Sequence, residues 1–199
     1  MHCAAKSVVF VFNSGSGSWR VDKSTSWDVL GLSGLTEYPL LCCPCYAYGC
    51  FYWKVESTNK LLKLNMNMEF STVDLPPDRD EDSIVVVEAG EGRLGLFSHI
   101  KDDTFLNYYT SMQIEGQKTI EWQIKNKIPL PIHDDLCIIR APQEYIFLLG
   151  NPAGEDTVQT CFSLEIKTLK IEKVCQMRFS SFYAFPYFGF PPSMSPRMI

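Results

Sequence analysis

The sequence has few alanines, few histidines and no long apolar run. Its 7 alanines stand against 26 aromatic residues (13 Phe, 9 Tyr and 4 Trp). Because alanine is the best helix former and aromatic residues suit half-buried strands, the composition favours β structure. The longest apolar runs, such as Val8–Phe12, contain five residues, whereas a membrane span needs about 20. We therefore expect a soluble chain without a membrane partner, located in the cytoplasm, the nucleus or both.

Charge of either sign is modest, with 18 basic and 23 acidic residues giving a net charge of −5. This mild acidity supplies no basic patch, so nucleic acid is not expected as a partner. The chain of 199 residues, 46% of them hydrophobic, is long enough to form one domain with its own core. We expect it to fold without a disulfide or a metal ion.

The eight cysteines include one dense group, Cys42-Cys43-Pro44-Cys45, which is followed by Cys50. A structural zinc site usually needs two ligand pairs with a short spacing within each pair. The spacing here is cramped, and the other candidate ligands are isolated. These are Cys137, Cys161, Cys175, His99 and His133. Free, buried thiols in a reducing compartment are therefore the preferred interpretation, with no metal and no cofactor.

A catalytic centre is not apparent in the sequence. The 3 histidines are scattered, and there is neither a Gly-x-Ser-x-Gly elbow nor a phosphate-binding glycine loop with a lysine. Gly90-Glu91-Gly92 predicts a tight turn. The acidic run Asp78–Asp82 predicts a solvated loop, because it lacks the glycine and the final glutamate of a calcium-binding loop. No catalytic residue is assigned.

Short strand-like runs separated by turn residues occupy most of the chain. Val8–Phe12 and Trp19–Val21 flank a Ser/Gly-rich turn and predict a hairpin. The stretch Ser24–Thr36 shows no clear pattern, and at most one helical turn is expected in it, around Trp27–Leu30. The other predicted strands are Cys50–Val55, Leu61–Leu64, Phe70–Leu75, Ile84–Val87, Arg93–Phe97, Leu106–Met112, Trp122–Ile128, Tyr145–Leu149, Thr160–Ile166 and Ile171–Val174.

These strands recur with a period. Strands at equivalent positions begin near Phe51, Arg93 and Tyr145, and Leu75-Pro76 and Leu130-Pro131 each close a unit. Three or four short strands repeated every 40 to 50 residues or so are typical of propeller blades. The fold class predicted is all-β, with antiparallel sheets forming about three to four blades of an open, partial propeller. An irregular antiparallel sandwich is the alternative.

Three segments together resemble a known family: Tyr48–Trp53, Leu61–Asn65 and Met68–Pro77. They are similar to the kelch-like, F-box-associated C-terminal region of plant F-box proteins, particularly the large grass family. The likeness continues in Glu88–Phe97, Phe162–Glu172 and Tyr187–Pro192. It implies that residues 1–199 form one β-propeller-like domain, with an aromatic and proline-rich tail over 176–199 expected to lie along a sheet.

The resemblance also implies a function, that of the substrate receptor of an SCF-type ubiquitin ligase, which binds client proteins. The helical F-box that docks the Skp-type adaptor has no match in this sequence. Binding of the adaptor and the cullin is therefore expected only if an F-box is supplied elsewhere, and the chain is interpreted as truncated. Asn65 replaces the family's usual aspartate, which affects only a turn.

Client-binding residues are expected among exposed aromatic side chains, because such residues dominate binding hot spots. Trp27, Tyr38 and Tyr109 are the candidates on the surface, whereas alternation places Phe51, Trp53 and Phe97 in the core. The alternative function is a propeller-type enzyme, either a glycoside hydrolase or a kelch-type oxidase. It is disfavoured because the carboxylates and histidines that such sites need are scattered.

Overall fold

The computed structural model describes residues 2–3, 6–32, 39–76, 83–100, 103–113, 120–131, 136–141, 144–150 and 158–177. Every regular element in these ranges is a β-strand, so the predicted all-β class is confirmed. The strands are β1 (His2–Cys3), β2 (Lys6–Asn13), β3 (Ser18–Ser26), β4 (Leu41–Ala47), β5 (Cys50–Val55), β6 (Lys60–Leu64), β7 (Phe70–Asp74), β8 (Ser83–Glu88), β9 (Leu94–His99), β10 (Phe105–Gln113), β11 (Ile120–Pro129), β12 (Cys137–Arg140), β13 (Tyr145–Gly150), β14 (Gln159–Glu165) and β15 (Lys170–Met177).

The strands form three four-stranded sheets, β4–β7, β8–β11 and β12–β15, and a three-stranded sheet β1–β3. All pairs of neighbouring strands are antiparallel and consecutive in the chain. The predicted hairpin is β2–β3, and the two predicted unit ends, Leu75-Pro76 and Leu130-Pro131, follow the last strands of the first two four-stranded sheets. The repeat period in the sequence therefore corresponds to one sheet.

The sequence prediction misses the first strand of two four-stranded sheets, β4 and β12, whereas the predicted strand Ile84–Val87 corresponds to β8. In β4, Pro44 cannot donate to a ladder, and the register shifts between Cys42 and Cys45. Because of this bulge, the Cys-rich segment does not show the alternation typical of a strand. In β12, only four residues are extended, and a run this short carries no periodic signal.

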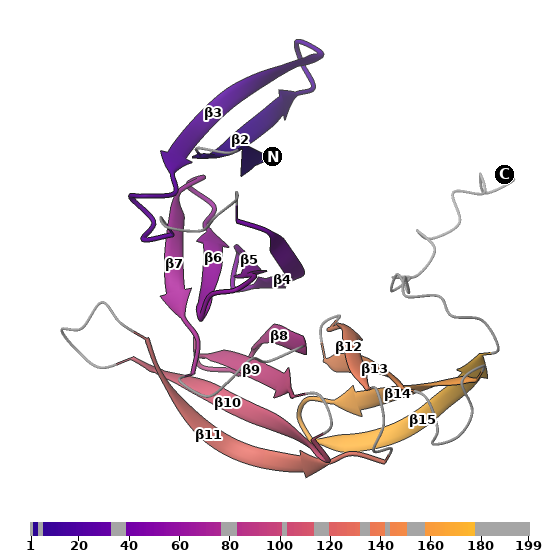
Figure 1. Cartoon of the computed structure of the whole chain (residues 1–199). Helices are drawn as coiled ribbons and strands as arrows, with labels where there is room; N and C mark the ends of the chain where they lie inside the picture. The colour runs from indigo at the N-terminus through magenta and orange to yellow at the C-terminus, as the bar shows by residue number, and fades with distance from the viewer. Residues whose placement is uncertain are drawn as a thin grey trace, which may run out of the picture.

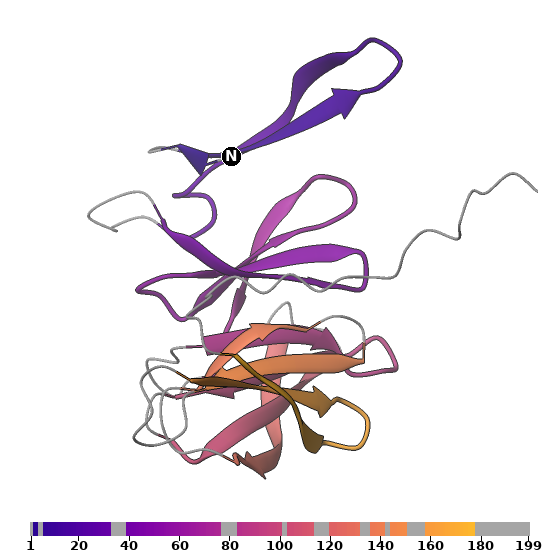
Figure 2. The same ribbon diagram turned by 90° about the vertical axis from the view of Figure 1, so that its right-hand side faces the viewer.

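Figure 1 shows the hairpin and the three four-stranded sheets following one another along an arc in chain order. The first strands, β4, β8 and β12, lie on the concave side of the arc, and the last strands, β7, β11 and β15, lie on its outer side. Figure 2, turned by 90°, shows that the two C-terminal sheets pack one over the other and that the hairpin projects from the opposite end.

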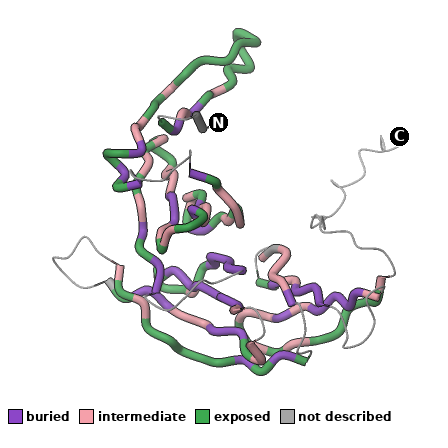
Figure 3. Tube along the Cα trace, in the orientation of Figure 1, coloured by how far each residue is buried: buried purple, intermediate pink, exposed green. Residues whose placement is uncertain are grey.

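The hydrophobic cores lie between the faces of consecutive sheets. One core joins Tyr52, Leu61 and Val73 of the β4–β7 sheet to Val86 and Leu96 of the β8–β11 sheet. The next core joins the other face of β8–β11 to β12–β15. Its members include Val85, Val87, Phe97, Leu106, Ile146, Leu148, Phe162 and Leu164. The middle sheet is therefore covered on both faces, and β8 is buried from Ser83 to Val87 (Figure 3).

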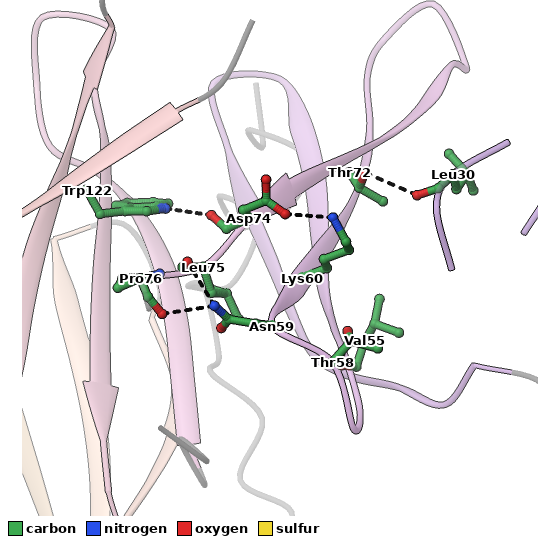
Figure 4. Close-up of polar contacts among 10 residues, drawn as sticks. All are labelled: Leu30, Val55, Thr58, Asn59, Lys60, Thr72, Asp74, Leu75, Pro76 and Trp122. Atoms are coloured by element: carbon green, nitrogen blue, oxygen red, sulfur yellow. Dashed lines mark hydrogen bonds and ion pairs between the residues drawn. The ribbon is translucent and has the colours of Figure 1, made fainter. Parts of the chain in front are cut away.

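The connection between the first two four-stranded sheets is held by polar contacts (Figure 4). The side-chain amide of Asn59 donates to the backbone carbonyl oxygens of Leu75 and Pro76, both at 3.1 Å. The indole N–H of Trp122 on β11 donates to the Asp74 carbonyl at 2.7 Å. The Leu75 N–H donates to the Asn59 carbonyl at 3.0 Å. These bonds fix the chain where it leaves one sheet and enters the next.

Residues 27–31 form a single hydrogen-bonded turn, which agrees with the expectation of at most one helical turn there: the Leu32 N–H donates to the Trp27 carbonyl at 2.9 Å, and Gly31 has a φ of 66°. The structure corrects one expectation about the aromatic residues. Among the three aromatics expected in the core, Phe97 is 0% exposed, but Phe51 is 46% exposed. Trp53 is half-buried. The aromatic tail is expected over 176–199: residues 176 and 177 belong to β15, and 178–199 lie outside the described residues.

Replacing the buried phenylalanine should cost much more stability than replacing the exposed one. Phe97 lies inside a core and its ring stacks on Tyr108 at 4.3 Å. Phe97→Ala should lower the free energy of unfolding by about 3–5 kcal/mol, and Phe51→Ala, the matched control, by under about 1.5 kcal/mol. Urea unfolding followed by tryptophan fluorescence measures both values. Equal losses would contradict the sheet stacking.

Candidate protein-interaction site

A cleft of about 550 Å³ opens where turns from all three four-stranded sheets meet. Its lining residues come from the end of β4 and the β4–β5 turn, from the end of β8 and the turn after it, and from the segments that join β12 to β13 and β14 to β15. They are Tyr46, Tyr48, Val86, Val87, Glu88, Gly90, Ala141, Glu144, Ile166 and Lys167. In an antiparallel meander the turns after the first and third strands lie at the same end of the sheet. When three such sheets are stacked, these turns come together on one face of the stack.

The β4–β5 turn presents Tyr48 to the cleft because of its backbone geometry. Tyr48 and Gly49 both have positive φ angles, 46° and 70°, as the two central residues of a type I′ hairpin turn require. Glycine adopts this conformation without strain, and the Tyr48 side chain remains 38% exposed at the tip of the turn. The local sequence thus places an aromatic side chain at the mouth of the cleft.

Polar contacts join the turns around the cleft. The Tyr48 N–H donates to a carboxylate oxygen of Glu88 at 2.7 Å. The Gly90 N–H donates to the Tyr48 phenol oxygen at 3.0 Å. Another pair on the wall joins Glu144 to Lys167, and this ion pair raises the pKa of the Lys167 ammonium. Glu88 and Tyr48 therefore connect two sheets, and the wall carries both signs of charge.

An aromatic row extends from the cleft along β4 and β5. Tyr46 is 57% exposed, and its ring centroid lies 5.1 Å from that of Phe51. Phe51 in turn stacks on Trp53 with the centroids 6.0 Å apart. Neighbouring rings that are held by a sheet lose little further side-chain entropy on binding, and exposed aromatic residues are enriched in binding hot spots.

Two of the surface residues expected from the sequence, Trp27 and Tyr109, do not line this cleft. Trp27 is 4% exposed and packs with Leu30 and Leu32 in a core under the hairpin, so the expectation that it lies on the surface is wrong. Tyr109 is half-buried against the core between the first two four-stranded sheets. Tyr38 lies outside the described residues.

Sequence reasoning missed Tyr46 and Tyr48 because it missed β4. Without that strand, Tyr48-Gly49 is not recognised as a hairpin turn. The available signal was the Tyr-Gly pair directly before the predicted strand Cys50–Val55, since a glycine there indicates a turn with positive φ. The predicted Gly90-Glu91-Gly92 turn also borders the cleft. The meeting of turns from three sheets depends on strand packing and carries no local signal.

The cysteines of β4 contact β8 at the concave side of the arc. The Val86 N–H donates to the Cys45 sulfur at 3.3 Å, and the Cys45 thiol donates to the Cys43 carbonyl at 3.1 Å. Hydrogen bonds from the Cys42 thiol and the Ile84 N–H to the Cys43 sulfur lower the pKa of Cys43 to about 6. Because the Cys42 thiol donates its proton in this hydrogen bond to Cys43, the pKa of Cys42 is raised.

The seven cysteines whose side chains are described are free thiols. Cys161 is the one buried thiol among them, and Cys175 is exposed. The others are half-buried, so the expectation of buried thiols is only partly met. Within the described ranges, no group of three or more His, Cys, Asp and Glu side chains is placed to hold a metal ion. The buried His99 ring contacts the Asp103 carbonyl at 3.1 Å, which is a structural contact at a strand end.

A scan against models of protein families finds no match, and neither does a search of curated proteins. In the part of the chain that the structure describes, no helix is long and apolar enough to cross a bilayer.

The lowered pKa of Cys43 predicts how its reactivity depends on pH. The thiolate is the nucleophile, so the rate of alkylation by iodoacetamide in the folded chain should reach half its maximum near pH 6, rather than near the ordinary thiol value of 9.0. Peptide mass spectrometry of Cys43 after timed labelling measures this profile. The same peptide in the urea-unfolded chain is the control, and coincidence of the two profiles would contradict the hydrogen-bonded thiolate.

Proposed function

We propose that this chain is a protein–protein interaction module whose partners bind across the cleft. The observation that carries the proposal is the convergence of turns from three sheets around exposed Tyr46 and Tyr48, next to Phe51. Turns on a rigid stack of sheets are well suited to binding because the scaffold fixes their positions. Aromatic rings supply contact area, and the Glu144–Lys167 pair and Glu88 supply polar contacts at the rim.

We further propose that the arc is part of a β-propeller of the F-box-associated, kelch-like kind, and that its partners are client proteins of an SCF-type ubiquitin ligase. Support comes from two sides. The chain repeats a four-stranded meander three times, with the first strand of each on the concave side (Figure 1), which is how propeller blades are arranged. The segments Tyr48–Trp53, Leu61–Asn65 and Met68–Pro77 independently resemble that family.

The enzyme alternative receives no support from the groups in the cleft. A glycosidase needs two carboxyl groups that face a bound sugar. Here Glu88 accepts a hydrogen bond from the Tyr48 backbone, and Glu144 pairs with Lys167. Both carboxylates thus serve contacts within the protein, as expected for the rim of a binding surface.

Removing the exposed ring of Tyr46 should weaken client binding. We expect Tyr46→Ala to reduce the affinity for a captured client at least about tenfold, because truncation of a hot-spot aromatic typically costs 2 kcal/mol or more. Clients are captured from plant lysate with the immobilised chain, identified by mass spectrometry, and the affinity is then measured by calorimetry. Phe105→Ala, which changes an aromatic residue that is 40% exposed on β10 and does not line the cleft, should bind normally. Equal binding by both variants and the unchanged chain would contradict the proposed site.

The chain alone should not retain the Skp-type adaptor. The family's adaptor-docking module is helical, whereas every regular element among the described residues is a strand. A pull-down with purified adaptor tests this, with an intact F-box protein as the positive control. Direct retention of the adaptor by residues 1–199 would show that a different surface docks it.

A further inference from the structure

The N-terminal sheet is less complete than the other three. Each of the others has four strands, whereas β1 contains two residues and pairs only with Lys6 and Ser7 of β2. From Val9 to Asn13, β2 is paired with β3 on one edge, and no described strand pairs with its other edge. Such an edge presents a row of backbone donors and acceptors that can pair with another strand.

A groove of about 450 Å³ runs along this edge. One side of the groove is formed by residues 7–10 of β2, and the other by residues of the neighbouring sheet. The latter are Leu41, Pro44, Trp53, Leu62, Leu64 and Phe70. The lining side chains are hydrophobic apart from that of Ser7, and the backbone of β2 adds polar groups, so the groove suits an extended segment with apolar side chains.

The hairpin also exposes apolar side chains in register. Phe10 pairs with Val21, and Phe12 pairs with Trp19, with the last two rings 5.2 Å apart. Their exposed fractions are 41%, 57%, 48% and 68% in that order. At about 200 Å² per aromatic side chain, these fractions leave roughly 400 Å² of apolar surface in solvent, which is the size of patch that marks an interaction site.

We propose that two copies of this chain associate through this edge, with their β2 strands pairing antiparallel across a two-fold axis. A two-fold axis makes two identical strands antiparallel, so each copy satisfies the other's backbone groups with the same residues. The run Val8–Phe12 is apolar on both faces and carries no charge. The product is a β3–β2–β2–β3 sheet, which has four strands like the other sheets of the chain.

The charges of the hairpin and the area of its apolar surface are compatible with a second copy of the chain as the partner. Three of the hairpin's four charged side chains pair within their own chain, Arg20 with Asp22 at 3.1 Å and Lys23 with Glu69 at 3.4 Å. The fourth, Lys6, lies where β1 pairs with β2, outside the stretch Val9–Asn13, which carries no charge.

A stable interface buries about 800 Å² per partner. Only Phe10 and Phe12 of the patch lie on β2 next to the new seam, because Val21 and Trp19 are on β3. These two side chains, the paired strand edges and the groove supply part of this area. We therefore expect a dimer of modest affinity.

Sedimentation equilibrium of the full chain, over concentrations from about 1 µM to 1 mM, tests the proposal. The unchanged chain should show a monomer–dimer equilibrium. Phe10→Lys should weaken it at least about tenfold, because an edge lysine blocks strand pairing. Val174→Lys, which changes a side chain that is 53% exposed on β15, is the matched control and should dimerise normally. Circular dichroism checks that both variants are folded.

Mixing Phe10→Lys with Phe10→Glu provides the sharper test. Each variant alone places like charges close to the two-fold axis, whereas the mixture places opposite charges there, so the mixture should regain the dimer that each variant lost. An unchanged chain that stays monomeric throughout would overturn the proposal. So would a dimer that persists in the Phe10→Lys variant, or a mixture that fails to associate.

Discussion

The stacking of the sheets depends on the contacts of β8, the first strand of the middle sheet, on the concave side of the arc. Its residues alternate between two cores, with Ile84 and Val86 on one face and Val85 and Val87 on the other. A strand buried on both faces still has an edge, and unpaired backbone groups at a buried edge are costly. In this chain the edges of inner strands are capped by side chains from the preceding sheet: Cys45 accepts from the Val86 N–H at 3.3 Å, and Ser83 accepts from the Ile138 N–H at 2.9 Å.

The same caps determine where the cleft lies. Because β4, β8 and β12 are held against one another, the turns that follow them meet on one face, and the Tyr48–Glu88 bond at 2.7 Å joins two of these turns directly. The cleft is therefore a consequence of the stacking rather than of any single loop. This explains why its residues come from segments as far apart in the chain as Tyr46 and Lys167.

The ends of the arc differ from its middle for the same reason. Among the described sheets, β8–β11 has a neighbour on each face, whereas the N-terminal hairpin has a neighbour only toward the β4–β7 sheet (Figure 1). The hairpin end contacts that sheet largely through the turn that buries Trp27 against Val55 and Leu62. Phe12 and Trp19 near the hairpin tip remain exposed, since none of the described sheets covers them. A strand edge and apolar side chains are left together at this end.

The sequence by itself determined most of the strands and turns and the length of the repeat, because alternation and turn residues act locally; β4 and β12 were missed. Cys50–Val55 has the same bounds in the prediction and in the structure, and Leu75-Pro76 ends a sheet as predicted. Tertiary structure decided what alternation leaves open. In the apolar run that includes Phe51 and Tyr52, either face could be buried, and the neighbouring sheet selects Tyr52, which is 2% exposed, over Phe51, which is 46% exposed. The cleft depends on the same long-range packing, which no local pattern in the chain encodes.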